Sequence, residues 1–211
     1  MIKTFYFNDL RTCCYVLYDS GGKCAIIDPG CYSESEKNRI VKFVTENSLE
    51  PLMIINTHGH FDHVMGNAFV SSRWNIPTYL NRADLPQLRR ASPYGSYFGY
   101  NFDPPVEDVI DMQDGDSVNV GGITLEVRTS PGHTAGGVIL YDPKGGYAFT
   151  GDTIFKGSIG RTDLPGGDYD LLADSIRKKV LTLPKETILY PGHGPSTTIA
   201  YEMMTNPFIA F

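Results

Sequence analysis

Four side chains that can bind a metal ion occur within six residues of this chain, in the string Thr57-His58-Gly59-His60-Phe61-Asp62-His63. The string follows PLMIIN, a continuous apolar run with the length of a buried strand. His58 and His60 stand two apart in an extended segment, so their imidazoles point to the same side. Asp62 and His63 come where the chain turns into a helix, and they can face a second point nearby. Neutral imidazole and carboxylate are zinc ligands, and catalytic zinc sites leave one position open for water.

Three more candidate ligands each stand beside a glycine in a tight turn at the end of an expected strand. Their strings are Pro131-Gly132-His133-Thr134, Thr150-Gly151-Asp152-Thr153 and Pro191-Gly192-His193-Gly194. All five histidines of the chain belong to these strings or to the first one. One structural zinc ion takes about four ligands. The seven candidates therefore indicate two ions, and they are His58, His60, Asp62, His63, His133, Asp152 and His193.

The first half of the chain supplies strands and helices that can position these residues. Strand-like runs occur near Phe5, at 13–19, at 24–28, at 51–56 and at 76–80. The run at 24–28 ends in the turn sequence Asp28-Pro29-Gly30. Ser33 with Glu36 forms a capping box for a first helix. A second helix is expected from after Asp62 to Trp74.

The second half repeats short strands in hairpins, followed by helices. Gly121-Gly122 is a good two-residue hairpin turn, and a second turn is expected at 143–146. Helices are expected at 169–181 and 197–204, on either side of a last apolar strand in TILYPGHG. This order predicts two mixed sheets face to face with helices outside, in a single domain of residues 1–211.

The segment 82–105 begins helically and then becomes a loop with five aromatic residues at 93–105. Loops of this kind either cover a pocket or pack their aromatic side chains over a neighbouring apolar face. The sequence leaves both alternatives open.

Composition narrows the partners and the compartment. The net charge of −6 argues against nucleic acid as the main partner, because phosphate-backbone binding needs a basic surface. No segment resembles a signal peptide or a membrane span, so we expect a cytoplasmic protein with a small-molecule substrate. The four cysteines, Cys13, Cys14, Cys24 and Cys31, form no Cys-x-x-Cys pair, and we expect small buried residues rather than disulfides. A thiolate metal site remains an alternative.

The string THGHFDH, with His133, Asp152 and His193 downstream, resembles the metallo-β-lactamase superfamily. The resemblance covers the whole chain in the expected order. It implies an αββα sandwich with helices on the outer faces and two metal ions at the sheet edge. It also implies which residues bind each ion. His58, His60 and His133 would bind one, Asp62, His63 and His193 the other, and Asp152 would bridge the two.

Within the superfamily the chain is most similar to the glyoxalase II group of thioester hydrolases. The supporting strings are GDTIF, GRTDLPGGD and YPGHGP. Only 18 residues follow His193, so the chain looks like the short relatives that lack the C-terminal helical domain of glyoxalase II. Arg161, in the GRTD string, stands where glyoxalase II has a basic substrate-binding residue. It is either that residue or an unrelated surface arginine.

The resemblance implies a hydrolytic mechanism. Two Zn²⁺ ions, with iron or manganese as alternatives in one or both sites, would activate a bridging hydroxide at neutral pH. Asp152 would bridge the ions, and Asp62 would orient the hydroxide and take its proton. Asp28 would contact a ligand residue, or it would serve only the turn.

The expected activity is hydrolysis of a small acyl thioester, such as S-lactoylglutathione, and the substrate is expected to be anionic. Three alternatives remain: an iron-dependent persulfide dioxygenase, a lactonase, and a β-lactamase. Classical β-lactamases usually carry cysteine at the position that matches Asp152. The sequence gives no prediction of oligomeric state.

Overall fold

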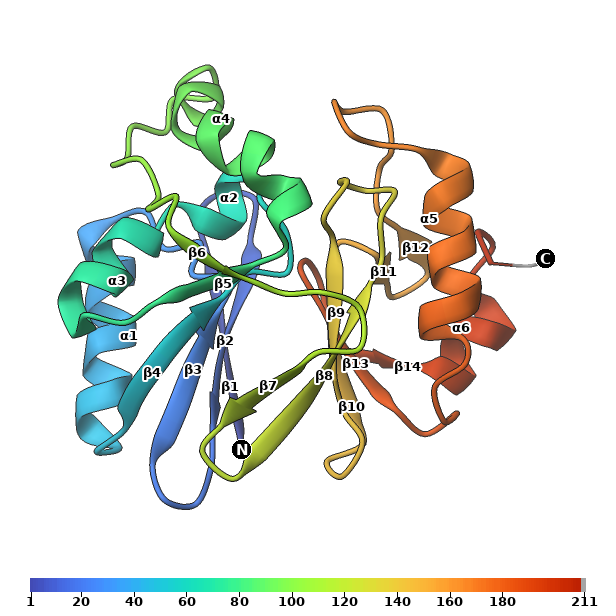
Figure 1. The fold of residues 1–211 in the computed structure, drawn as a ribbon, viewed down its shortest axis with the longest axis horizontal. Coiled ribbons are helices and arrows are strands. Elements are labelled where there is room, and N and C mark those ends of the chain that lie inside the picture. The colour runs from blue at the N-terminus through green and yellow to red at the C-terminus, as the bar shows by residue number, and fades with distance from the viewer. Residues whose placement is uncertain (210–211) are drawn as a thin grey trace.

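The computed structural model describes residues 1–209, and the last two residues of the expected domain lie outside them. Two six-stranded sheets face each other (Figure 1). The first contains β1 (Ile2–Phe7), β2 (Thr12–Tyr18), β3 (Lys23–Ile27), β4 (Glu50–Ile55), β5 (Thr78–Leu80) and β6 (Val109–Asp111), in that order. The second contains β7 (Ser117–Val120), β8 (Ile123–Thr129), β9 (Val138–Asp142), β10 (Tyr147–Gly151), β13 (Ile188–Pro191) and β14 (Thr197–Thr198), in the order β14-β13-β10-β9-β8-β7. The strands β11 (Ile154–Phe155) and β12 (Ser158–Ile159) form a separate small hairpin.

Both sheets are mixed, as the sequence predicts. In the first, β1, β2 and β3 pair antiparallel, whereas β3 to β6 pair parallel. In the second, β7 to β10 are antiparallel, and β13 runs parallel to β10. The Gly121-Gly122 turn is confirmed, since Val120 pairs with Ile123 across it.

The helices lie on the outer faces of the sheets and at one end of the sandwich. They are α1 (Glu34–Glu46), α2 (Phe61–Val64), α3 (Asn67–Trp74), α4 (Leu85–Ser96), α5 (Tyr169–Ser175) and α6 (Ile199–Thr205). A 3₁₀ turn at Arg82–Asp84 precedes α4, and a π-helical segment at Ile176–Val180 continues α5. Helices α1 and α3 lie outside the first sheet, and α5 and α6 lie outside the second (Figure 1). The αββα sandwich is confirmed. No helix among the described residues is long and apolar enough to cross a membrane.

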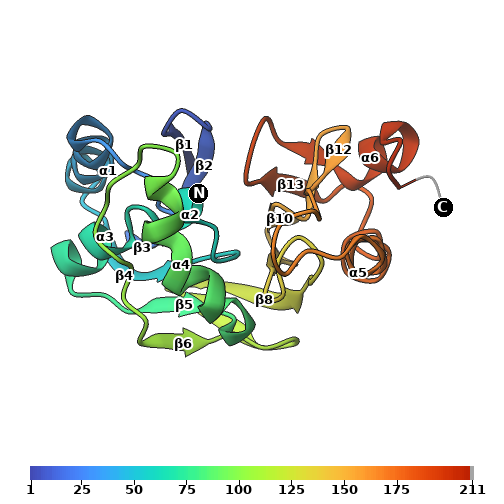
Figure 2. The ribbon, with the colours of Figure 1, turned by 90° about the horizontal axis from the view of Figure 1, so that it is seen from above.

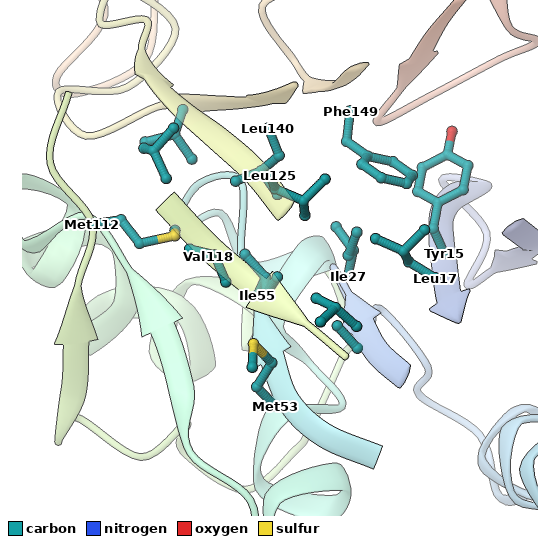
Figure 3. Packing of buried hydrophobic residues seen from close by; sticks show 14 of the residues in the cluster. Tyr15, Leu17, Ile27, Met53, Ile55, Met112, Val118, Leu125, Leu140 and Phe149 are labelled. Atoms are coloured by element: carbon teal, nitrogen blue, oxygen red, sulfur yellow. The ribbon is translucent and has the colours of Figure 1, made fainter. Parts of the chain in front are cut away.

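The main core lies between the two sheets, where side chains from both inner faces interlock (Figure 3). Strand β2 is buried on both faces, so its neighbouring cysteines enter different cores. Cys13 joins the core between the sheets, and Cys14 joins the core under α1. All four cysteines are buried and free, as expected for small apolar residues. Burial raises the pKa of the Cys13 thiol to about 11, which disfavours a thiolate ligand there.

The capping box at the start of α1 is confirmed. The Ser33 hydroxyl accepts a hydrogen bond from the backbone N–H of Glu36, whose carboxylate accepts one from the N–H of Ser33. The helix buries Ile40 and Val44 against the outer face of the first sheet. The sequence therefore predicted both the start of this helix and its buried face.

The expectation of one helix from Asp62 to Trp74 is wrong. Helix α2 starts at Phe61 and ends at Val64, and α3 begins at Asn67. Between them, the N–H of Gly66 donates to the carbonyl of Pro29 at 2.8 Å instead of continuing the helix. A Cβ on Gly66 would lie 2.4 Å from both the Pro29 oxygen and the Cys31 sulfur, so only glycine allows this approach.

The aromatic loop begins later than the sequence predicts. Helix α4 continues through Pro93 to Ser96, although proline has no N–H to donate within a helix. Three residues of α4, Leu88, Ala91 and Gly95, are buried and offset that cost. Gly95 lies so close to the Phe102 ring that a Cβ would be 2.7 Å from it.

Candidate metal centre

The seven candidate ligands meet at one end of the sandwich, because each follows the end of a strand. Residues 58–63 follow β4 of the first sheet. His133, Asp152 and His193 follow β8, β10 and β13 of the second sheet. Seen from above, α2 and α4 lie at this end of the first sheet (Figure 2). The site is therefore built from both sheets.

Two groups of three residues lie close enough to bind an ion each. The possible ligand atoms of His58, His60 and His133 all lie within 4.8 Å of one another, and so do those of Asp62, His63 and His193. A third grouping, Asp28 with His58 and His63, meets the same criterion.

Asp152 lies between the two main groups. Its Oδ2 is 3.5 Å from Nε2 of His133 and 3.6 Å from Nε2 of His193, and its Oδ1 is 3.5 Å from Nε2 of His63. One carboxylate thus faces ligand atoms of both groups, which is the arrangement that a bridging ligand requires.

Unpaired polar atoms in this centre fit bound metal. Nε2 of His58, Nε2 of His133 and Oδ1 of Asp152 are buried, and each lacks a hydrogen-bond partner among residues 1–209. Buried polar atoms without a partner are costly and uncommon. All three are metal-donor atoms, and they point into one small region, so the donor set suits a pair of divalent cations.

The other nitrogen of four imidazoles is held by the protein. Nδ1 of His63 lies 3.1 Å from Asp28, and Nδ1 of His58 lies 3.1 Å from the Thr57 hydroxyl. The remaining two contacts are to backbone carbonyls: His133 Nδ1 to Arg161 O at 2.7 Å and His193 Nδ1 to Leu10 O at 3.1 Å. Such contacts fix ring orientation and leave Nε2 free for a metal.

Asp28 does more than shape its turn. Its carboxylate accepts hydrogen bonds from the Thr57 N–H at 2.8 Å and the Thr57 hydroxyl at 2.6 Å, besides the contact with His63. Its backbone is also left-handed, with φ at +48°. The residue thus joins the end of β3 to the first residues of the ligand string.

Asp84 is a positioning residue that the sequence analysis missed. Its carboxylate accepts hydrogen bonds from the Gly59 N–H, the Thr134 hydroxyl and the Gly136 N–H at 2.8, 2.7 and 2.6 Å. It is fully buried and ties the loop of His58 and His60 to the loop of His133. The sequence offers no motif for it, because all its partners are distant along the chain.

Charge is distributed unevenly over the histidines. Burial lowers the pKa of His60 to about 4, with help from His133, and burial moves the pKa of His58 well below its usual range. Burial also disfavours charge on His63, but Asp62, Asp152 and Asp28 together raise its pKa to about 10. In the protein without metal, one proton on His63 thus partly balances the carboxylates, and bound cations would replace that charge.

A cavity of about 640 Å³ opens over the centre. His60, Asp62, His133, Asp152 and His193 form its polar part. Its apolar walls include Leu10, Phe61, Tyr94, Phe98 and Phe155. Phe61 stacks on Phe98 with ring centroids 5.5 Å apart. The aromatic segment therefore both borders a pocket and packs over its neighbours, the two roles that the sequence left open. Tyr94 and Phe98 line the cavity, and Phe102 packs against Gly95.

Arg161 also lines this cavity, but its guanidinium is already paired. Its Nε and Nη2 donate to the two carboxylate oxygens of Asp163 at 2.7 and 2.8 Å. The side chains of this pair are mostly exposed. The backbone carbonyl of Arg161 is the atom that contacts a candidate ligand, His133.

Comparison with known proteins agrees with this geometry. The sequence model of the metallo-beta-lactamase superfamily matches residues 8–193, from the loop after β1 to the last candidate ligand. The chain belongs to the metallo-β-lactamase superfamily. The match includes all seven candidate ligands.

Two relatives of nearly the same length are hydrolases by name. The chain is 38% identical to the "Probable metallo-hydrolase YqgX" of Bacillus subtilis, over 90% of this chain and 89% of the relative. It is 35% identical to the "Hydroxyacylglutathione hydrolase GloC" of Haemophilus influenzae, over 93% of this chain and 92% of the relative.

Solved structures of superfamily proteins show the same fold. The structure of the BLEG-1 B3 metallo-beta-lactamase has a TM-score of 0.89 and 36% identity, covering 100% of both chains. The structure of TTHA1623 in a di-iron-bound form has a TM-score of 0.88 and 37% identity, covering 98% of this chain and 99% of that one. The chain is thus a metal-dependent hydrolase by family, with a centre that suits two ions.

Proposed function

We propose that residues 1–211 form one hydrolase domain that cleaves small acyl thioesters with a dinuclear metal centre, most simply two zinc ions. The observation that carries the proposal is the placement of Asp152 between two groups of three ligands on the floor of a largely apolar cavity. The relative named hydroxyacylglutathione hydrolase supports the thioester substrate. The neighbour in a di-iron-bound form makes iron the alternative metal.

The metals would supply Lewis acidity and a hydroxide nucleophile at neutral pH. His58, His60 and His133 would bind one ion, and Asp62, His63 and His193 the other. The chain orients the Asp62 carboxylate through its Oδ2, which accepts a hydrogen bond from the Thr12 hydroxyl at 2.7 Å and lies 3.3 Å from His193 Nε2. A carboxylate fixed in this way is suited to orient the attacking water and to accept its proton.

The cavity walls support a small acyl substrate. The aromatic surface of Phe61, Tyr94 and Phe98 faces the same space as the candidate ligands, so an acyl chain can pack there while the thioester carbonyl reaches the centre. Arg161, which lines the cavity, would contact the substrate at its rim.

A β-lactam is the second candidate substrate. The similar structure of a B3 metallo-beta-lactamase favours it. An aspartate at position 152, where classical β-lactamases usually carry cysteine, favours the thioester instead.

The test is a hydrolysis screen of the zinc-loaded and the iron-loaded protein. S-lactoylglutathione, simple acyl thioesters, lactones and β-lactams would be compared by kcat/KM. We expect thioesters to exceed the other classes by about tenfold or more, which is about 1.4 kcal/mol of transition-state discrimination. Hydrolysis of lactones or β-lactams without thioester hydrolysis would overturn the proposal.

A further inference from the structure

A second, smaller cleft adjoins the cavity over the metal centre. It has a volume of about 90 Å³, enough for roughly three water molecules. The two spaces share four lining residues, His60, Phe61, Tyr94 and Leu164. Since His60 belongs to the candidate ligands, a substrate group in this side cleft would be close to the reacting carbonyl.

One face of α4 forms a wall of the side cleft. Gln87, Arg90, Ala91 and Tyr94 all line it, and their spacing of three, one and three residues places them on the same side of a helix. The Gln87 side chain donates a hydrogen bond to the carbonyl of Pro165, which fixes the opposite wall. The cleft is therefore a built feature between α4 and the loop at 164–165.

Arg90 is the cation of this cleft, and its charge is not balanced there. Among residues 1–209, no hydrogen bond, ion pair or ring contact joins its guanidinium to another side chain, whereas Arg89 pairs with Glu107 at 2.8 Å. The residues that line the cleft include no carboxylate. Arg161, the other arginine at the site, is already paired with Asp163 through two hydrogen bonds.

We propose that Arg90 in the side cleft binds a carboxylate carried by the substrate, a role that rests on the proposed thioester hydrolysis. A guanidinium presents paired N–H donors that match a carboxylate, and the Arg90 side chain is exposed, so an entering substrate can reach it. Arg90 would hold that carboxylate in the side cleft, while the thioester carbonyl reaches the metal centre in the adjoining cavity. Arg90 is then a specificity residue, and its replacement should change KM for carboxylate substrates more than kcat.

The first test compares three thioesters with the zinc-loaded protein. S-butyryl-3-mercaptopropionate carries a carboxylate on the thiol side, S-ethyl monothiosuccinate carries one on the acyl side, and S-butyryl-3-mercaptopropionamide carries none. Arg90→Ala is expected to raise KM about tenfold for at least one carboxylate substrate, as loss of a charged hydrogen bond implies, and to leave the amide within about twofold. Arg90→Lys should recover part of the loss.

Arg89→Ala is the matched control, because its neighbouring guanidinium is paired with Glu107 on the exposed surface. It should leave all three substrates unchanged. Equal effects of Arg90→Ala on the carboxylate substrates and the amide, or no effect on any of them, would overturn the proposal.

A second measurement does not require turnover. Binding of the thioethers 3-(butylthio)propanoate and 3-(butylthio)propanamide to the zinc-loaded protein would be followed by ligand-observed NMR. If Arg90→Ala weakens binding of the propanoate about tenfold and leaves binding of the propanamide unchanged, the role of Arg90 is supported. That result would hold even if no thioester were hydrolysed. If thioesters are hydrolysed but neither experiment shows a preference for carboxylate that depends on Arg90, the proposed role of Arg90 is wrong. The proposed thioester hydrolysis would then still stand.

Discussion

At the scale of residues, the candidate centre depends on contacts that hold one nitrogen of an imidazole and leave the other free. The sequence predicted the seven candidate ligands from their residue types and spacing, and it offered Asp28 as either a partner of a ligand or a turn residue. It did not predict the contacts of His133 and His193, because those are backbone carbonyls of Arg161 and Leu10. A backbone carbonyl is present at every residue, so no residue type reveals such a partner.

Asp28→Asn should weaken metal binding about ten- to a hundredfold, because an amide cannot replace the carboxylate that contacts both His63 and Thr57. Competition with a chromophoric chelator would measure the affinity. The control is Asp142→Asn, since Asp142 is also buried and its carboxylate accepts hydrogen bonds at the β9–β10 turn, remote from the centre. Unchanged affinity in Asp28→Asn would mean that the aspartate serves the turn alone.

In the metal-free protein, His63 should remain protonated at pH 8, because three carboxylates raise its pKa to about 10. An unfolded histidine loses its proton near pH 6.5. The proton on His63 therefore stabilises the metal-free fold fully below about pH 6.5, and this contribution is lost as the pH rises through about 10. Nitrogen NMR of the imidazoles would detect the charged ring. If all five histidines were neutral at pH 8, the raised pKa of His63 would be contradicted.

At the scale of elements, the loops between strands and helices decide where the ligands point. The capping box, the hairpin turns and the strand runs were predictable because they depend on neighbours in sequence. The break between α2 and α3 was not, since it depends on Pro29, which is distant along the chain. The length of α4 was not either, because burial of Leu88, Ala91 and Gly95 against the rest of the fold offsets the cost of Pro93. Asp84 was missed for the same reason.

Gly66→Ala should destabilise the protein by about 1–3 kcal/mol, because the new Cβ would lie 2.4 Å from the Pro29 oxygen and the Cys31 sulfur. It should also weaken metal binding, since Pro29 follows Asp28. Urea unfolding would measure the free energy. Gly122→Ala is the control, with the nearest atom 3.7 Å from its Cβ, and a loss there as large as in Gly66→Ala would contradict the steric explanation.

At the scale of the whole molecule, the two sheets are joined by their shared core and by the centre at one end. The first sheet supplies the ligand string after β4, and the second supplies His133, Asp152 and His193. A backbone hydrogen bond from Val138 to Thr57 links the sheets beside this string. Bound metal would add a further link between the two halves.

Removal of metal with a chelator should lower the melting temperature. A cation present at about a hundred times its Kd stabilises the folded state by about 2.7 kcal/mol per site. For a domain of this size that corresponds to roughly 5–10 °C. Differential scanning calorimetry before and after chelation would show the shift, and Zn²⁺ should reverse it while Mg²⁺ should not. An identical melting temperature in both states would show that the centre does not link the sheets.

The central claim is that the seven residues bind two ions, and metal stoichiometry tests it most directly. Protein purified without chelator would be saturated with Zn²⁺, freed of excess metal by gel filtration and analysed by mass spectrometry for metal per chain. The expected value is two ions per chain, falling towards one in His60→Ala, which removes a ligand from one group only. Saturation of the unaltered protein at one ion per chain would contradict the dinuclear centre.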